Sequence, residues 1–323
     1  IASQAVITGA YSVTQQAIQL GFLPRLRVVH TSGSAIGQIY VPFVNWMLMI
    51  AVVILVLGFQ SSSSLAAAYG VAVTGTMLID TLLIGAVIFL IWRWSRFPAA
   101  ILVSVFLIAD LCFFLANIGK VTHGGWFTLA VGLVIFVLLT TWKRGRQLLS
   151  ARIDQDAMPV DIFLKSISNR AVRVPGTAIF MTGRPNGIPS ALLHNLKHNK
   201  IIHERNILLT VEMQPVAHVP MERRLSAAEL GPGFHRLTMI FGFMDDPDVP
   251  SALRHAEEFG LPINLMETSF FISRETIVVS MLPGMMLWRE ALFAWMSRNA
   301  ATAMEFFGLP TNRVVELGAQ VEI

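Results

Sequence analysis

Long apolar stretches alternate with short polar ones over the first 146 residues of the chain. Each stretch approaches or exceeds the roughly 20 residues that an α-helix needs to cross a hydrocarbon layer of about 30 Å. Five such spans are predicted, at about residues 1–20, 39–59, 65–91, 98–118 and 125–142. The pattern therefore indicates an α-helical membrane domain fragment at residues 1–146.

The third predicted span, residues 65–91, has two different halves. Its first half is rich in small and hydroxylated residues, with Tyr69 as the one large polar group, whereas its second half is plain Leu, Ile, Val and Phe. Small residues let helix backbones approach closely, and Gly70 and Gly75 lower the helix propensity where membrane helices bend or unwind. We therefore expect the first half to face protein or a cavity and the second half to face lipid.

The first predicted span is rich in polar residues. Ser, Thr and Gln recur among its apolar residues, which is costly in a membrane unless they face other helices or water. Ser3, Thr8 and Ser12 lie four or five residues apart, about one helical turn, so we expect them to share a face. This span is therefore predicted to lie inside a helix bundle.

Composition divides the chain in nearly the same place. Residues 1–150 contain eight Lys or Arg and only two acids, whereas residues 151–323 contain sixteen basic and eighteen acidic residues. Over the whole chain 14% of the residues are charged and the mean hydropathy is +0.62, which lies outside the soluble range. The basic balance comes from the loops of the membrane half, so no nucleic-acid partner is expected.

Basic residues are concentrated in alternate loops. The loops at residues 25–30, 93–96 and 143–146 carry two, two and three Lys or Arg, whereas those at 60–64 and 119–124 carry none and one. The positive-inside rule places the first set in the cytoplasm. We therefore expect a multi-pass protein of the bacterial cytoplasmic (inner) membrane whose C-terminal domain is cytoplasmic.

Beyond residue 146 the apolar pattern changes from long spans to short segments. Strands are predicted at residues 176–182, 206–213, 234–244, 268–273 and 276–282. Helices are predicted at residues 190–199, 249–259 and 285–299. Such a mixture is typical of a compact α/β domain, which we assign to residues 147–323. The predicted fold class of the whole chain is therefore mixed, a membrane helix bundle followed by an α/β domain.

The sequence contains no recognisable motif of an enzyme active site or a metal site. It has no phosphate loop, nucleophile elbow, HExxH or dinucleotide fingerprint, so no enzyme is predicted. His194 and His198 are spaced i, i+4 on a predicted helix, with His203 nearby, but no third ligand follows at a metal-like spacing. No cofactor or metal is therefore expected. The single Cys112 excludes an intramolecular disulfide.

Six segments spread over nearly the whole chain carry a family resemblance. They are IASQAVITGAYSVTQQAIQLGFLPRLRVVHTS, GQIYVPFVNW, SSSSLAAAYGVAVTGTM, LLHNLKHNKIIHERN, METSFFISRET and NRVVELGAQVEI. Together they resemble the Kup (KUP/HAK/KT) family of potassium uptake transporters. Because long stretches carry the likeness, it is a specific one.

The resemblance implies a fold and a function. Members of this family have about twelve spans, the first ten forming two inverted five-helix repeats of the LeuT (APC) type, and they move potassium with protons. This chain would then hold the eighth to twelfth spans, two of them additional to the ten-helix core, and the cytoplasmic domain. Ile1 lies inside an apolar stretch without an initiator Met, so we expect upstream spans of the same protein to precede it.

The resemblance also points to residues on the ion path. Tyr69 falls in the AAAYG motif of the tenth span, on the inward side of the path that the family implies. Potassium is weakly hydrated and best held by several neutral oxygens, so the hydroxyls of Tyr69, Thr74 and Thr76 are suitable. The structural alternative is that these hydroxyls bond to the preceding helical turn or to a neighbouring helix.

Five further polar residues are secondary candidates. Ser3, Thr8 and Ser12 belong to the eighth span, which borders the cation region in a LeuT-type plan, with interhelical hydrogen bonding as the alternative. Asp80 and Asp110 are the two acids of the membrane half, and a buried carboxylate suggests a proton-linked role by default. Because both lie beyond the small-residue segment, a structural partner is favoured for each.

We therefore predict proton-coupled potassium uptake. The expected partners are the lipid membrane, potassium, a proton, the upstream spans and, as an option, a second copy in a homodimer. One alternative is an amino-acid or other small-solute carrier, but no Lys or Arg lies inside a predicted span to bind a carboxylate. The other is a membrane-anchored soluble enzyme or regulatory domain, which the many polar residues of the spans disfavour.

Overall fold

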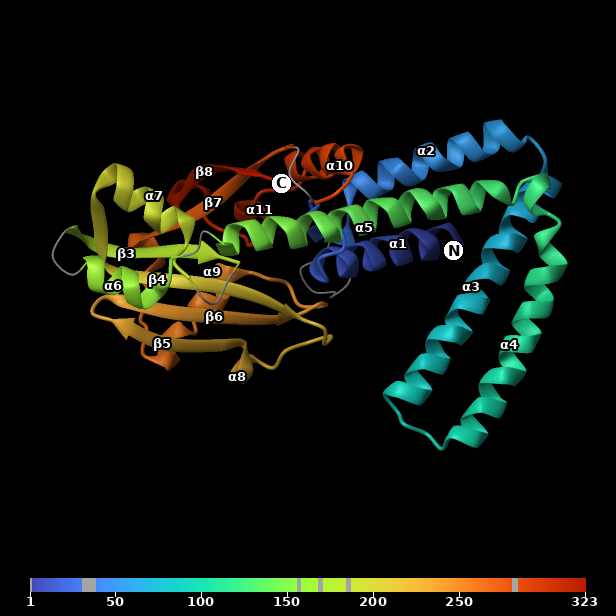
Figure 1. The fold of residues 1–323 in the computed structure, drawn as a ribbon, viewed down its shortest axis with the longest axis horizontal. Coiled ribbons are helices and arrows are strands. Elements are labelled where there is room, and N and C mark those ends of the chain that lie inside the picture. Colours follow the sequence, from blue (N-terminus) through green and yellow to red (C-terminus); the bar gives the residue numbers. More distant parts are fainter. Residues whose placement is uncertain (1, 31–38, 156–157, 168–170, 184–186, 281–283) are drawn as a thin grey trace. The chain divides into compact units, whose positions relative to one another are not determined.

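The computed structural model describes residues 2–30, 39–155, 158–167, 171–183, 187–280 and 284–323. The chain divides into two compact units, one formed by Ile1–Val44 with Leu139–Ile323 and the other by Asn45–Leu138. The second unit contains most of the apolar helices (Figure 1).

Four helices among the described residues are long and apolar enough to cross a membrane. They are α2 (Pro42–Phe59), α3 (Ser62–Leu90), α4 (Arg96–Ile118) and α5 (Trp126–Gln155). The first predicted span forms helix α1 (Ala2–Gln19), which is long enough at 18 residues but not apolar enough to be among the four. The membrane-spanning role of α1 therefore stays a prediction.

Helices α3 and α4 form a hairpin that depends on small residues. A Cβ atom at Gly70 would come within 2.8 Å of the Asn117 Oδ1 atom, and one at Gly85 would lie 3.1 Å from Val103. Ser61 caps α3 by accepting a hydrogen bond from the Ser64 N–H at 3.3 Å. The helix stays α-helical through Gly70 and Gly75. Gly70 serves close packing, whereas a Cβ at Gly75 would make only an ordinary contact, 3.8 Å from the Phe114 ring.

The turn between α4 and α5 contains the 3₁₀ helix η1 (Val121–His123) and a glycine with a special conformation. Gly124 has a φ of 130°, and a Cβ there would lie 2.8 Å from both the Phe59 ring and the Ser64 carbonyl oxygen. Only glycine fits this backbone and this close approach. The turn is thereby packed against the ends of α2 and α3.

Helix α5 continues well past the basic residues that end its apolar part. It runs without a break from Trp126 to Gln155, although the sequence predicts a span only to about residue 142. Lys, Arg, Gln and Leu are good helix formers, so charge ends the apolar stretch without ending the helix. The second half of α5 therefore belongs to the same compact unit as the C-terminal domain.

A six-stranded sheet with order β5-β6-β4-β3-β7-β8 forms the centre of the C-terminal domain. Its strands are β3 (Val172–Thr182), β4 (Ile201–Gln214), β5 (Leu225–Gly231), β6 (Phe234–Gly242), β7 (Thr268–Val278) and β8 (Val314–Glu322). All neighbouring pairs are parallel except β5 with β6. A parallel sheet needs helical cover on both faces, which fits an α/β domain.

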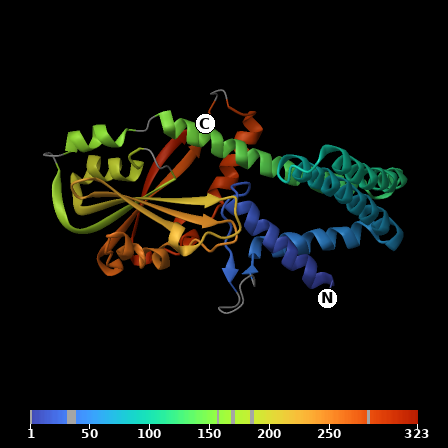
Figure 2. The same cartoon turned by 90° about the horizontal axis from the view of Figure 1, so that it is seen from below.

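The two faces of the sheet have separate apolar cores. Figure 2 shows the sheet with helices on both of its sides. One core packs α6 (Val160–Ile167) and α7 (Ser190–Asn199) against strand residues such as Phe180 and Phe271. The other packs α9 (Val249–Leu253) and η2 (Ala256–Phe259) against residues such as Ile179 and Phe270. Alternating strand residues therefore serve opposite faces.

The remaining elements connect or flank this sheet. They are the short strands β1 (Val29–His30) and β2 (Ile39–Tyr40) and the helices α8 (Met221–Arg224), η3 (Leu265–Glu267), α10 (Leu287–Arg298), α11 (Ala303–Phe306) and η4 (Thr311–Arg313). Strands β1 and β2 pair antiparallel with each other, apart from the six-stranded sheet.

The predicted elements of this domain are partly right. Helix α7 has the predicted bounds, and α10 lies inside its predicted range. The two strands predicted at 268–273 and 276–282 are one strand, β7, and the helix predicted at 249–259 is split into α9 and η2. Helix α6 and strands β5 and β8 were not predicted.

Candidate functional site

The hydroxyl-bearing half of α3 divides into two faces. The Thr74 Oγ1 atom donates to the Gly70 carbonyl at 2.8 Å, and the Thr76 Oγ1 atom donates to the Ala72 carbonyl at 2.9 Å. Thr74 lies on the buried face, whereas Tyr69 and Thr76 are exposed and, seven residues apart, share the other face. A hydroxyl that donates to the backbone keeps its lone pairs, so both threonines retain acceptor capacity.

The two acids of the membrane half have different surroundings. Asp110 on α4 is buried, and its Oδ2 atom accepts a short hydrogen bond of 2.5 Å from the Thr81 hydroxyl on α3. This bond joins the two helices of the hairpin. Asp80, which precedes Thr81 on α3, is exposed. The structure therefore supplies a structural partner, Thr81, for Asp110. The Asp80 carboxylate has no part in that hydrogen bond.

The candidate residues of α1 lie in the other compact unit and do not all share a face. Ser3 and Thr8 are exposed and Ser12 is half-buried. Ser3 and Thr8 are five residues apart, which is about 140° around an α-helix, so only Thr8 and Ser12 lie on one side. The expectation of a face shared by all three is wrong for a regular helix.

The three histidines His194, His198 and His203 make different ring contacts. The rings of His194 and His198 stack on α7 with centroids 6.0 Å apart, whereas the His203 ring packs edge-on against Phe271 at 5.8 Å. Burial lowers the pKa of His203 and so favours its neutral form. Among the residues that the structure describes, no group of three or more His, Cys, Asp or Glu side chains could hold a metal ion.

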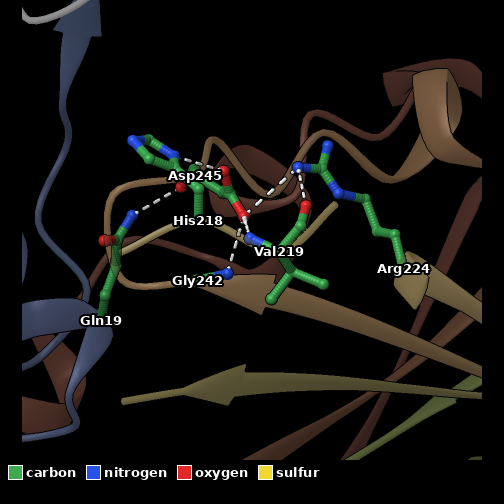
Figure 3. A network of polar contacts seen from close by, with 6 residues as sticks. All are labelled: Gln19, His218, Val219, Arg224, Gly242 and Asp245. Carbon is green, nitrogen blue, oxygen red and sulfur yellow. Dashed lines mark hydrogen bonds and ion pairs between the residues drawn. The ribbon is translucent and has the colours of Figure 1, made fainter. Parts of the chain in front are cut away.

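Sequence reasoning missed a polar network around Asp245, in the turn that follows β6 (Figure 3). Its Oδ2 atom accepts from the Gly242 N–H at 2.7 Å and the Val219 N–H at 3.0 Å. The Arg224 guanidinium lies 3.2 Å from the same oxygen, and His218 Nδ1 lies 2.8 Å from Oδ1. The carboxylate therefore joins the turn after β6 to the loop and helix before β5.

Ionisation of Asp245 is stabilised by these contacts. Burial by itself disfavours the charged form, but hydrogen bonds from Val219, His218 and Gly242 and the charge of Arg224 outweigh it and lower the pKa of Asp245. The carboxylate is thus a fixed negative charge near neutral pH. Asp245 is therefore a structural centre of this region. Its partners are too dispersed in the sequence to form a motif.

The same turn binds the end of α1. The Gln19 Nε2 atom donates to the Asp245 backbone carbonyl at 2.9 Å, across 226 residues of sequence. Gln19 is buried, and it also lines a cavity of about 250 Å³ that includes Arg27, Asp248 and Glu305. The first helix is therefore attached directly to the C-terminal domain.

Arg25, in the segment after α1, is a second point of attachment. Its backbone carbonyl accepts from the Ala301 N–H at 2.7 Å, and its guanidinium lies over the rings of Phe306 and Phe307 at 5.6 and 5.4 Å. Burial, and to a smaller extent the charge of Arg146, lower the pKa of Arg25 to about 10, against the opposing effect of Glu275. The residue stays protonated at neutral pH, so the cation–π contacts persist.

Helix α5 is attached to α10 in the same unit. The Arg289 Nε atom donates to the Thr141 hydroxyl at 2.9 Å and Nη2 donates to the Thr140 hydroxyl at 3.3 Å. The Trp142 and Phe293 rings lie 5.2 Å apart, and a Cβ at Gly145 would be 2.4 Å from the Phe293 ring. The contacts of Gln19, Arg25 and Arg289 together form what we call the junction, through which α1 and α5 hold the C-terminal domain.

Two family models match the chain in succession. The model for the K+ potassium transporter integral membrane domain matches residues 1–147, and the model for the K+ potassium transporter C-terminal domain matches residues 175–323. Together they cover α1 to α4, α5 as far as residue 147, and the six-stranded sheet except the start of β3.

Bacterial relatives are similar over the whole chain. The probable potassium transport system protein Kup 2 of Rhizorhabdus wittichii is 58% identical over 323 residues, which is 100% of this chain and 50% of that protein. Probable potassium transport system proteins Kup of Erythrobacter litoralis and Zymomonas mobilis are 57% and 55% identical, with 100% of this chain and 52% and 50% of those proteins covered. The chain spans about half the length of the curated relatives it matches.

Proposed function

This chain belongs to the Kup family of potassium transporters, and we propose that the full-length protein takes up potassium across the bacterial cytoplasmic membrane. The observation that carries the proposal is the succession of two potassium-transporter models over nearly the whole chain, with relatives at 55–58% identity that are named potassium transport proteins. Their names describe transport, which favours a carrier over an enzyme.

We further propose the membrane arrangement that the family resemblance implies. In it, α1 to α5 are the eighth to twelfth spans, α1 to α3 complete a LeuT-type core, and α4 and α5 lie outside that core. Residues 1–146 form the membrane domain, and residues 147–323 form the cytoplasmic domain. The alternation of basic loops supports the cytoplasmic side for the C-terminal domain.

Potassium would meet neutral oxygens on α3. Tyr69 and Thr76 are the better candidates, because both are exposed on one face of the helix and both keep lone pairs for a cation. Thr74 is the weaker one, since it lies on the buried face of α3. Thr8 and Ser12 of α1 remain secondary candidates, whereas Asp110 has the role of joining α3 and α4.

The C-terminal domain would stabilise or regulate the inward-facing side of the transporter. The junction supports this role, because Gln19 and Arg25 bind the domain directly at the end of α1. A movement of the domain would therefore pull on a helix of the transport core.

Uptake by the full-length protein tests the proposed function. Expressed in bacteria that lack their own potassium uptake systems, it should accumulate radioactive rubidium but not amino acids, and a protonophore should abolish the accumulation if protons drive it. Amino-acid uptake without rubidium uptake would establish the small-solute carrier instead. Rubidium uptake that survives the protonophore would retain potassium transport and remove the proton coupling.

A variant that lacks residues 151–323 tests the role of the C-terminal domain. We expect it to change the uptake rate or the apparent potassium affinity, or to reduce the amount of folded protein in the membrane. If folding, rate and affinity were all unchanged, the domain would have no part in transport. The full-length protein with Gln19→Ala is the milder companion, because only one hydrogen bond to the domain is lost.

A further inference from the structure

Helix α10 is apolar on the face that it leaves exposed. Trp288 and Trp295 are seven residues apart, share one side of the helix and are 53% and 52% exposed. Met286 and Leu287 beside them are 64% and 54% exposed. The opposite face is also apolar and is buried through Phe293, Ala294 and Met296. A helix that is apolar on both faces is normally covered on both.

The position of α10 along α5 fixes its depth. Its residues Arg289 and Phe293 contact α5 between Thr140 and Gly145, where the apolar part of α5 ends and its basic residues begin. A Cβ at Gly284, just before α10, would lie 3.1 Å from Leu148, less than one turn beyond Gly145. In a helix that crosses a membrane, this is the level at which hydrocarbon gives way to headgroups.

The chemistry of the exposed face suits that level. Tryptophan is the residue that favours the membrane–water boundary, because its ring is apolar and its N–H can bond to headgroups or water. Trp288 and Trp295 are the only two tryptophans after residue 142, and both lie on this face. Two of seven tryptophans in one twelve-residue helix of an otherwise ordinary α/β domain is a concentration that packing inside the domain does not require.

The charges around α10 also suit an anionic surface. Its one acid, Glu290, is fully buried, and the exposed charge of the helix is Arg298. Lys143, Arg144 and Arg146 are exposed on the neighbouring turns of α5. Bacterial cytoplasmic leaflets carry anionic lipids, which attract such clusters.

We propose that α10 lies on the cytoplasmic surface of the membrane, with Trp288 and Trp295 inserted among the lipid headgroups. This rests on the proposed membrane crossing of α5. The C-terminal domain is then held at the membrane at two points. One is its covalent continuation from α5, and the other is the interfacial helix α10, which follows strand β7 in the sequence. Lipid composition would thereby act on the domain, and through the junction on α1.

Photo-crosslinking in the full-length protein tests this placement. p-Benzoylphenylalanine is introduced separately at Trp288 and Trp295, in proteoliposomes of phosphatidylethanolamine and phosphatidylglycerol, and adducts are identified by mass spectrometry after irradiation. Met266 is the matched control, because it is 70% exposed and precedes the amino end of β7, whereas α10 follows the carboxyl end of that strand, ~35 Å away at the usual rise per residue. Leu133, in the apolar part of α5 and 63% exposed, reports on the membrane crossing itself.

We expect phospholipid adducts at positions 288 and 295 in several-fold higher yield than at position 266. Adducts at 288 and 295 with protein, either a second copy or the upstream half, would overturn the proposal and identify a protein interface. Lipid adducts at 133 without any at 288 or 295 would overturn it while leaving the membrane crossing intact. Absence of lipid adducts at position 133 as well would contradict the proposed membrane arrangement, and the placement of α10 with it.

Discussion

In helix α3 the hydroxyls of Thr74 and Thr76 donate to carbonyl oxygens four residues earlier, whereas the carboxylate of Asp245 accepts from one loop, a helix and the end of a strand. The first kind of bond is made within one helical turn, so its loss should have little effect on the stability of the fold. The second kind links segments that are distant in sequence, beside the backbone hydrogen bonds that Phe243 and Met244 donate to the carbonyls of Val216 and Ala217. Polar substitutions in the two regions should therefore report on different properties, transport in α3 and folding in the C-terminal domain.

The largest expected effect is that of Asp245→Ala. It leaves the buried N–H groups of Val219 and Gly242 without this acceptor and removes the carboxylate from the Arg224 ion pair, at a cost of about 3–5 kcal/mol. Thermal unfolding of the purified full-length protein measures it. Gln19→Ala removes only a bond to the backbone of the same residue and should cost about 1 kcal/mol. Equal shifts for both variants would show that the carboxylate is not the centre of this region.

Gly242→Ala tests the same turn through its backbone. The added Cβ would lie 2.3 Å from the Ala217 carbonyl oxygen, a backbone atom that cannot move aside alone, so we expect destabilisation of up to about 3 kcal/mol. Gly318→Ala on β8 is the matched control, because no atom lies within 4 Å of its added Cβ. A melting temperature that falls equally in both variants would contradict the close packing at Gly242.

Arg289→Ala tests the junction between α5 and α10. Two hydrogen bonds to Thr140 and Thr141 are lost from a half-buried guanidinium, which should cost about 1.5 kcal/mol. Hydrogen exchange of α10 should rise in this variant and stay unchanged in Arg298→Ala, which alters an exposed arginine of the same helix. Unchanged exchange in Arg289→Ala would mean that the helix is held by its apolar face alone.

The contribution of Asp245 should depend on pH with a definite sign. Because its pKa is lowered in the folded protein, the folded state favours the carboxylate, and this stabilisation is fully present above the unfolded value of about 3.9. It is lost as the pH falls through the lower folded value. The difference in melting temperature between the wild type and Asp245→Asn should therefore be constant near neutrality and narrow only below about pH 4. Narrowing between pH 7 and 5 would contradict a lowered pKa of Asp245 as the origin of the effect.

The sequence predicted the apolar helices and the inner strands well because their signals are local. The apolar stretches of α2 to α5 can be recognised within each segment. The same is true of the bounds of α7. Strands β5 and β8 were missed because they lie at the edges of the sheet, where exposed charges and small residues interrupt the apolar pattern. The end of the apolar part of α5 was located, but the continuation of the helix was not.

The candidate residues were predicted on chemical type, and their surroundings could not be predicted. The family resemblance and the chemistry of neutral oxygens suggested Thr74 and Thr76 together with Tyr69, but the helix places Thr74 on its buried side. The partner of Asp110 lies 29 residues away on α3, and the partner of Gln19 lies 226 residues away. Such pairings depend on the packed fold, so no motif in one sequence contains them.

Rubidium uptake by full-length Tyr69→Phe and Thr76→Val variants tests the central claim most directly, that neutral oxygens on the exposed face of α3 meet the potassium ion. Each substitution removes one hydroxyl from an exposed position, so the free energy of unfolding should stay within about 0.5 kcal/mol of the wild-type value. The account predicts that the KM for rubidium rises several-fold in both variants and stays unchanged in Thr122→Val, whose hydroxyl lies in the turn before α5. A wild-type KM in both α3 variants would contradict it.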